Sequence, residues 1–310
     1  MFRTVALSLL LAACATGAMA QGGHQHTATP FDIAITVDDL PAHGALPKGM
    51  TRVGIARSYL DTLHRHGVKQ AYGFVNAVQI EKEPDSAPVL ALWRKAGYPL
   101  GNHTYTHLNL DSAPSLAAWQ ADVEQGEPAV AAQMKSADWH WLRFPNLSAG
   151  RDAERHDAAA AWLAGRGYRI ADVSMSFSDW AYTDTYARCV AQGNMQAIAM
   201  MKRDYLRSVD EGIAWTKATS NAVYGRMIPQ VLLTHVGGWS AVMLPEVMAR
   251  LDAAGAHYVP LAQAEADPAY AQADTLPGGG GIMERWAKSR NIALPMPPPA
   301  LPSYLPTLCR

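Results

Sequence analysis

Ionisable side chains follow the ends of five predicted strands in this chain of 310 residues. The apolar run DIAITVD ends in two adjacent carboxylates, Asp38 and Asp39. The other strand ends carry His103 after YPLGN, Arg143 in LRFPN, Asp179 in SFSDW and His235 in QVLLTH. Because active sites of parallel α/β folds lie beyond the carboxyl ends of the strands, this pattern predicts one catalytic site.

The segment HTYTH supplies two histidines, His103 and His107, at positions i and i+4. On a helical turn this spacing places both imidazoles on one face, where they can share a metal ion. Thr104 stands where the zinc-protease pattern requires glutamate, so a third ligand must come from elsewhere. The carboxylates of Asp38 and Asp39 are the obvious donors, and a helix cap or turn is the alternative role for this pair.

Strands and helices alternate from residue 31 onward, which predicts an α/β fold with a mainly parallel sheet. Helical segments are expected at residues 51–67 and 86–97, and over much of 182–227. The seven candidate strands suit a barrel and span residues 32–38, 70–76, 98–102, 140–145, 169–177, 230–235 and 257–261. We therefore expect a single catalytic domain over residues 31–265.

The first twenty residues have the pattern of a secretory signal, with Arg3 ahead of the short apolar run VALSLLLAA. Small residues before Gln21 fit a cleavage site, whereas LAAC, ending at Cys14, fits a lipoprotein box. Both alternatives predict export to the periplasm, the cell envelope or the medium, with membrane contact only through an N-terminal lipid. Residues 21–30 form a polar linker in which His24 and His26 are expected to be solvated.

Composition and the C-terminal region add two expectations. The formal net charge of −1 gives no basic excess, so no nucleic-acid partner is expected. Residues 266–310 are rich in proline and glycine and are predicted to form a tail that extends over the surface. Cys189 and Cys309 either form a disulfide that ties this tail to the body or remain free thiols.

The five polar segments together resemble a known family, the polysaccharide deacetylases of the NodB-homology type, or carbohydrate esterase family 4. The matching segments, in family order between residues 36 and 235, are TVDDL, HTYTH, RFP, SDW and LTH. The resemblance implies a distorted parallel (β/α) barrel of about seven strands. It also implies a divalent metal, zinc with cobalt or nickel as alternatives, held by Asp39, His103 and His107.

The same resemblance implies roles for residues around the metal. Asp38 would be the catalytic base and His235 the catalytic acid, oriented by Arg143 and Asp179 respectively. The residues implied to contact the substrate are Trp180 and Leu233, which would line a pocket for the acetyl methyl group, and Pro145 and Asn146, near a backbone N–H for the oxyanion.

The chain departs from the family pattern at Leu40, Asn146 and Ser176. Leu40 and Asn146 are expected at the rim, where they would alter the substrate groove more than the metal site. His43 lies close enough in sequence to be a further site residue.

The predicted function is an exported metal-dependent deacetylase that hydrolyses N-acetyl groups on a carbohydrate. The alternatives are an O-acetyl esterase, a non-sugar amidohydrolase, or a carbohydrate-binding protein without turnover. The complete set of base, acid and metal ligands favours catalysis, because binding alone needs neither a base nor an acid.

Overall fold

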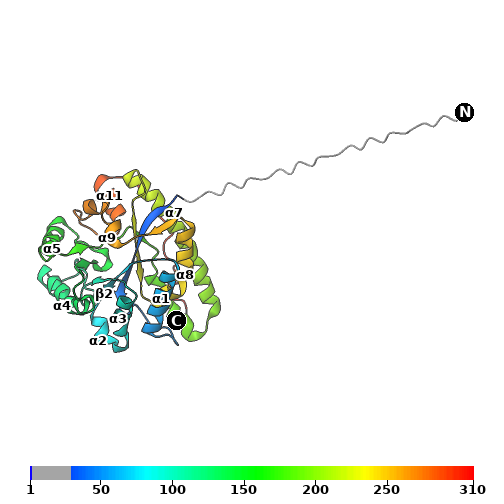
Figure 1. Cartoon of the computed structure of the whole chain (residues 1–310), viewed down its shortest axis with the longest axis horizontal. Helices are drawn as coiled ribbons and strands as arrows, with labels where there is room; N and C mark the ends of the chain where they lie inside the picture. The colour runs from blue at the N-terminus through cyan, green and yellow to red at the C-terminus, as the bar shows by residue number, and fades with distance from the viewer. Residues whose placement is uncertain (2–28) are drawn as a thin grey trace.

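A computed structural model describes residue 1 and residues 29–310 of the chain. Apart from residue 1, the predicted signal peptide lies outside the described residues, as does most of the predicted linker, including His24 and His26. Strands occupy the middle of the molecule and helices surround them (Figure 1). No helix among the described residues combines the length and the hydropathy of a bilayer span.

The sheet is parallel throughout, and its long central strand is β1. The strand order is β5-β4-β3-β2-β1-β7-β6, and β8 pairs with the start of β1. The strands are β1 Phe31–Leu40, β2 Ala71–Val75, β3 Leu100–Asn102, β4 Trp141–Leu142, β5 Arg169–Ile170, β6 Met175–Ser176, β7 Gln230–His235 and β8 Ala256–Tyr258. The predicted distorted (β/α) barrel is confirmed.

The barrel is open between β5 and β6, which do not pair among the described residues, and the chain itself bridges this gap. The predicted strand at 169–177 is two short strands, and β5 and β6 lie at opposite edges of the sheet. Residues 171–174 cross from one edge to the other: Ala171 donates its N–H to Leu142 at the β4 edge, and Ser174 donates to Val231 on β7. Because these four residues join the two edge strands, the sheet must curl until β5 and β6 lie close to each other.

Local sequence signals set the helix boundaries. The hydroxyls of Thr51 and Ser115 accept N–H groups in the first turns of α1 and α4. Gly225 ends α7 in the left-handed conformation that glycine adopts without strain. The helices are α1 Arg52–Arg65, α2 Val78–Lys82, α3 Pro88–Lys95, α4 Leu116–Met134, α5 Ala153–Gly165, α6 Trp180–Gln192, α7 Met195–Tyr224, α8 Gly238–Ala253, α9 Leu261–Ala264, α10 Pro268–Ala273 and α11 Ile282–Arg290, with short 3₁₀ turns at Pro84–Ser86 and Pro145–Leu147.

The C-terminal region is more ordered than a surface tail. Helices α10 and α11 lie within the segment predicted to be extended, and Ile282 and Met283 are buried in the core. Residues 274–281 and 291–310 lack regular structure, and even in the second of these segments Leu305 is buried. Apolar positions at helical spacing in IMERWAKSR explain the difference, since such a helix gains stability by burying that face.

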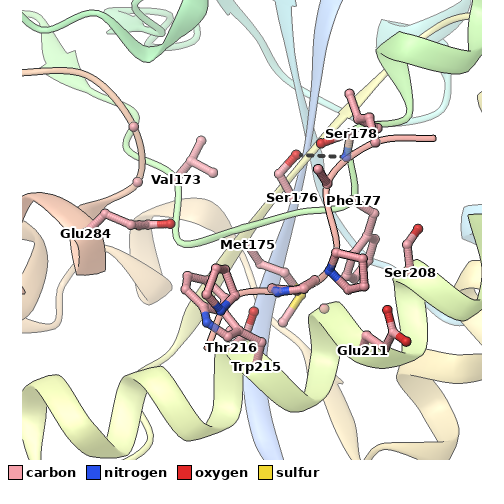
Figure 2. Close-up of a pocket in the computed structure, with 18 of the residues that line it drawn as sticks. Val173, Met175, Ser176, Phe177, Ser178, Ser208, Glu211, Trp215, Thr216 and Glu284 are labelled. Carbon is pink, nitrogen blue, oxygen red and sulfur yellow. Dashed lines mark hydrogen bonds between the residues drawn. The ribbon is translucent and has the colours of Figure 1, made fainter. Parts of the chain in front are cut away.

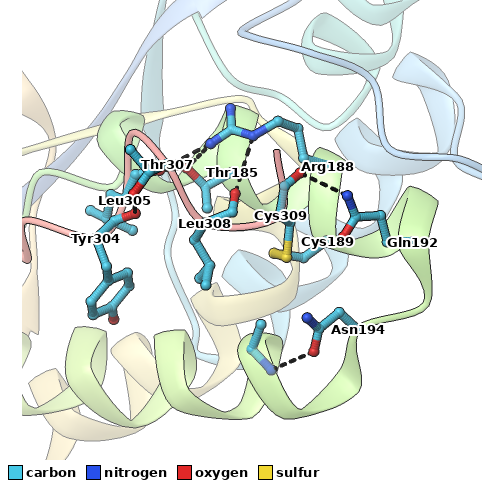
Figure 3. The surroundings of a disulfide bond; sticks show 11 residues. Thr185, Arg188, Cys189, Gln192, Asn194, Tyr304, Leu305, Thr307, Leu308 and Cys309 are labelled. Carbon is cyan, nitrogen blue, oxygen red and sulfur yellow. Dashed lines mark hydrogen bonds between the residues drawn. A yellow bond between two sulfur atoms is a disulfide. The ribbon is translucent and has the colours of Figure 1, made fainter.

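The end of the chain is fixed to α6. Cys189 and Cys309 form a disulfide, which resolves the alternative left open by the sequence (Figure 3). Beside it, the hydroxyl of Thr185 donates to the carbonyl of Leu305 at 2.7 Å, and Arg188 donates to the same carbonyl at 3.0 Å. The last residues are therefore part of the folded domain.

Candidate active site

A β-bulge separates the two adjacent carboxylates on β1. The register against β2 shifts between Val37 and Leu40, and Asp39 has a φ of +62°. Aspartate tolerates this left-handed conformation better than most residues. As a result Asp38 is buried against Arg143, whereas Asp39 faces the histidines.

Asp39, His103 and His107 bring three metal-ligating atoms together. Asp39 Oδ1 lies 3.6 Å from Nε2 of His103 and 3.6 Å from Nε2 of His107. Ligands bound at ~2.1 Å around a tetrahedral zinc ion would be about 3.4 Å apart. Asp39 Oδ1 is buried and has no hydrogen-bond partner among the described residues. This donor set therefore fits a divalent metal.

The two histidines meet in a loop, so the predicted helical turn is wrong. Residues 103–107 are not helical, and Thr104 and His107 both have φ near +60°. The amide of Asn76 donates to the carbonyls of His103 and Thr104, at 2.5 and 3.0 Å. Two left-handed residues and this anchor reverse the chain, which leaves the ring centroids of the histidines 4.9 Å apart.

His103 is held in the tautomer that a metal ligand needs. Its Nδ1 donates to the carbonyl oxygen of Arg143 at 2.7 Å, so Nε2 keeps its lone pair toward Asp39. Burial lowers the pKa of His103 to about 4, against the opposing effect of the Asp38 charge. The imidazole is therefore neutral at neutral pH, as metal binding requires.

Arg143 fixes the buried carboxylate of Asp38. Its Nη1 donates to the two carboxylate oxygens at 3.0 and 3.3 Å, its Nη2 donates to Thr36 Oγ1 at 3.0 Å, and its Nε donates to the carbonyl of Ala171 at 2.6 Å. Thr36 is missing from the sequence-derived site, although a signal existed. It precedes Asp38 by two residues in a strand, so both side chains lie on the same face.

Asp179 fixes the side chain of His235 through hydrogen bonds, as Arg143 fixes that of Asp38. Nδ1 of His235 donates to Asp179 Oδ1 at 2.8 Å, and the backbone N–H of His235 donates to Oδ2 at 2.8 Å. The hydroxyl of Ser240 also donates to Oδ2, at 2.6 Å. Sequence reasoning missed Ser240, because nothing in GGWS distinguishes it from a turn serine.

The pKa values of His235 and Asp179 are shifted in opposite directions. Burial alone would lower the pKa of His235, but the charge and hydrogen bond of Asp179, with Asp39 and Asp38, raise it to about 9. Burial would raise the pKa of Asp179, but the charge and hydrogen bonds of His235 and the bond from Ser240 lower it. His235 is therefore an imidazolium paired with a carboxylate at neutral pH.

His43 forms a hydrogen bond with the second carboxylate oxygen of Asp39. Its Nδ1 lies 2.7 Å from Asp39 Oδ2, and its ring lies 4.6 Å from the ring of His235. Burial would raise the pKa of Asp39, but this hydrogen bond, together with the charges of the neighbouring histidines, lowers it. The structure therefore brings His43 into the site as a neighbour of both Asp39, a predicted metal ligand, and His235, the predicted acid.

The residues predicted to contact substrate have different environments. Trp180 begins α6 directly after Asp179 and is 51% exposed, so it is not a core residue. Leu233 and Pro145 are buried. Asn146 has a φ of +57°, and its side-chain oxygen accepts a hydrogen bond from Asn109 at 3.2 Å.

Leu40 does not lie at the rim, contrary to the prediction. It is fully buried, and its side chain occupies the space left by Gly73 on β2. The bulge at Asp39 reverses the alternation of β1 locally, which returns Leu40 to the core side. A leucine here therefore fills the interior and does not shape the groove. Ser176, by contrast, is exposed on β6.

The chain resembles known proteins in part of its sequence and in its fold. Residues 25–163 match the family model described as polysaccharide deacetylase. No curated protein matches the chain in sequence.

Solved structures share the fold at low identity. A chitin deacetylase from the fungal pathogen Colletotrichum lindemuthianum is 20% identical with a TM-score of 0.51, over 77% of this chain and 89% of that one. A peptidoglycan N-acetylglucosamine deacetylase catalytic domain from Eubacterium rectale is 18% identical with a TM-score of 0.50, over 75% and 89%. A family 4 pseudoenzyme from Bacillus anthracis is 14% identical with a TM-score of 0.51, over 76% and 66%.

The family match covers the two segments that carry Asp38, Asp39, His103 and His107, and the barrel continues through β7, which carries His235. The structural neighbours have the same barrel architecture. The chain therefore resembles the polysaccharide deacetylase family over residues 25–163 and shares the barrel fold of solved deacetylases.

Proposed function

We propose that this protein is an exported, metal-dependent deacetylase that hydrolyses N-acetyl groups on a carbohydrate. The observation that carries the proposal is the arrangement around Asp39, His103 and His107. The carboxylate of Asp38, held by Arg143, lies 3.5 Å from Nε2 of His103. His235, held by Asp179, has a ring nitrogen within 4.8 Å of a carboxylate oxygen of Asp39. Binding without turnover requires neither pair.

A divalent ion bound by Asp39, His103 and His107 would supply Lewis-acid polarisation of water and of the acetyl carbonyl. Asp38 would accept the proton of the attacking water. Its two hydrogen bonds from Arg143 fix the orientation of the carboxylate, and its Oδ2 lies 3.5 Å from Nε2 of His103. The base is therefore placed beside the metal ligands without being needed as one.

His235 would protonate the departing amine. An amine is a poor leaving group unless it gains a proton, and general acids of this kind contribute ~10²–10⁴-fold in rate. Because Asp179 keeps His235 protonated through neutral pH, the proton is available when the C–N bond breaks. This feature favours acetamides over acetyl esters, whose alkoxide leaving groups need less assistance.

Acetate release tests the proposal directly. The metal-loaded protein should release acetate from N-acetylated glycan oligomers with added zinc, cobalt or nickel, and faster than from O-acetylated xylan oligomers. Exchange of the exposed Glu154, which lies on α5, for Gln is the matched control and should leave the rate unchanged. Turnover of O-acetyl but not N-acetyl substrates would replace the proposal with an esterase, and binding without any acetate release would replace it with a carbohydrate-binding protein.

Export is a separate part of the proposal, and it rests on the signal-like pattern of residues 1–20. N-terminal analysis of protein recovered from the cell envelope should show a mature chain that begins at Gln21 or at a lipidated Cys14. A full-length chain retained in the cytoplasm would contradict it.

A further inference from the structure

A cavity of about 600 Å³ is lined by the loop after β6, the middle of α7, the start of α11 and the proline-rich segment 294–302 (Figure 2). The indole N–H of Trp215 on α7 donates to the carbonyl of Pro295 at 3.2 Å, which holds that segment against the helix. The residues that line this cavity include neither the predicted metal ligands nor the predicted base and acid. Any residue that adjusts the metal site must therefore lie elsewhere, in contact with the ligands themselves.

His43 is such a contact, and it has no role in the chemistry described so far. Its Nδ1 lies 2.7 Å from Asp39 Oδ2, a distance typical of a hydrogen bond. An ionised carboxylate can only accept hydrogen bonds, so Nδ1 of His43 is the donor. The other oxygen, Asp39 Oδ1, lies 3.6 Å from Nε2 of His103 and of His107. The two oxygens of Asp39 are therefore divided between His43 and the candidate metal position.

The backbone that carries His43 is held in place by two helices. Arg52, buried at the start of α1, donates to the carbonyl of His43 at 3.0 Å and to that of Gly44 at 2.6 Å. Arg52 is itself paired with Glu83 at 2.7 Å. Gly44 has a φ of +58° and packs against Thr183 on α6, where a Cβ would lie 2.7 Å from Cγ2. His43 thus projects from a fixed backbone, so its ring can hold another side chain in position.

The ring of His43 is confined as well. Its side chain is only 15% exposed, and its centroid lies 4.6 Å from that of the His235 ring. A Cβ on Gly237 would lie 3.0 Å from Cδ2 of His43, so the glycine leaves the room that this ring orientation needs. The hydrogen bond to Asp39 is therefore made by a side chain with little freedom to turn away.

Direct metal binding is the competing role for His43. Ligand atoms of Asp39, His43 and His235 lie within 4.8 Å of one another and form a second possible donor set. The 2.7 Å between His43 Nδ1 and Asp39 Oδ2, however, is shorter than the ~3.4 Å between two ligands of a tetrahedral zinc ion. The distance favours a hydrogen bond over a shared metal ion.

We propose that His43 is a positioning residue of the metal site, which donates to Asp39 Oδ2 and so holds Oδ1 toward His103 and His107. The inference rests on the metal site of the proposed function. A carboxylate that is already oriented loses less conformational freedom when the ion binds. Loss of a hydrogen-bond partner of a metal-ligating side chain typically costs ~10–100-fold in metal affinity or activity. His43 would therefore tighten metal binding without being a ligand.

Competition for zinc tests the inference without depending on turnover. The zinc-loaded mature chain is titrated with a chromogenic zinc chelator, and the wild type is compared with His43→Leu and His43→Asn. Asparagine can donate from Nδ2 at the position of the imidazole Nδ1, whereas leucine has nearly the same shape and no donor. We expect His43→Leu to bind zinc about tenfold more weakly or worse, and His43→Asn to recover most of the difference. Replacement of the exposed His64 on α1 by leucine is the matched control.

Three results would overturn the inference. The first is a zinc affinity of His43→Leu equal to that of the wild type. The second is an equal loss in His43→Leu and His43→Asn, which would mean that the ring fills space and that its donor is unimportant. The third is a second equivalent of zinc in the wild type that both variants lose, which would make His43 a ligand with Asp39 and His235. Failure of the proposed function alone would appear differently, as a zinc affinity that depends on His43 in a protein that releases no acetate from any glycan.

Discussion

Replacement of Asp179 by asparagine should move the alkaline limit of activity to lower pH. Asp179 is the main group that raises the pKa of His235 from 6.5 to about 9, through its charge and the 2.8 Å hydrogen bond to Nδ1. Asparagine preserves the shape but removes the charge, so the pKa of His235 should fall to 6.5 or below, since burial alone lowers it. That difference corresponds to about 3 kcal/mol.

The expected loss depends on pH in a defined way. At pH 7.5 a pKa of about 9 leaves roughly 97% of His235 protonated, whereas a pKa of 6.5 leaves roughly 9%. The variant should therefore lose about tenfold in kcat/KM at pH 7.5 from protonation alone, and more if asparagine selects the other tautomer. The deficit should shrink as the pH is lowered toward 6, because His235 then regains its proton.

The assay is the pH profile of acetate release for the wild type, Asp179→Asn and the control Asp157→Asn, whose exposed carboxylate lies on α5. An alkaline limb at the same pH in the wild type and in Asp179→Asn would refute the reasoning, and so would a constant deficit at every pH. The second result would mean that Asp179 only supports the fold.

Stability should follow the same ionisation. The folded-state pKa of His235 is raised, so its contribution to the free energy of unfolding is complete below about pH 6.5 and is lost as the pH rises through about 9. Asp179 has a lowered pKa, so its contribution is present above 3.8 and is lost as the pH falls through the folded value. Urea titrations of the wild type between pH 6.5 and 9.5 should show a decline that Asp179→Asn lacks.

Three further predictions concern the metal, the base and the disulfide. Replacement of His107 by alanine should strip zinc from the purified protein by elemental analysis and abolish the rise in melting temperature on zinc addition; unchanged metal content would contradict the ligand assignment. Asp38→Asn should keep the metal but lose ~10²–10⁴-fold in kcat, and a wild-type rate would exclude Asp38 as the base. Cys309→Ser should lower the free energy of unfolding by about 2–4 kcal/mol under oxidising conditions and by nothing under reducing conditions, because it opens a loop of 120 residues; equal loss in both would mean that the serine disturbs packing.

The sequence determined the parts of this protein that depend on local chemistry. Apolar runs with flanking turn residues identified most of the strands and the helices near residues 51–67, 86–97 and 182–227, because burial of one face imposes a period that is visible along the chain. The polar residues at the strand ends identified Asp38, Asp39, His103 and His235, because parallel strands place their carboxyl ends on one side of a barrel. Family motifs then assigned expected roles to these residues.

Tertiary structure decided how those residues meet. The i, i+4 spacing of His103 and His107 suggested a helical turn, but packing against Asn76 forms a loop instead. The bulge that separates Asp38 from Asp39 and returns Leu40 to the core depends on register with β2, a strand about 35 residues away. Long-range contacts of this kind leave no period in the sequence.

The same limit applies to residues that act through others. Ser240 supports His235 only because α8 begins beside Asp179, and the pairing of Cys189 with Cys309 depends on where residues 291–310 run along the body. The proline-rich segment has a composition typical of a solvated tail, yet its contact with α7 makes it a cavity wall. Composition reports the local preference of a segment, whereas its partner is selected by the packing of the whole domain.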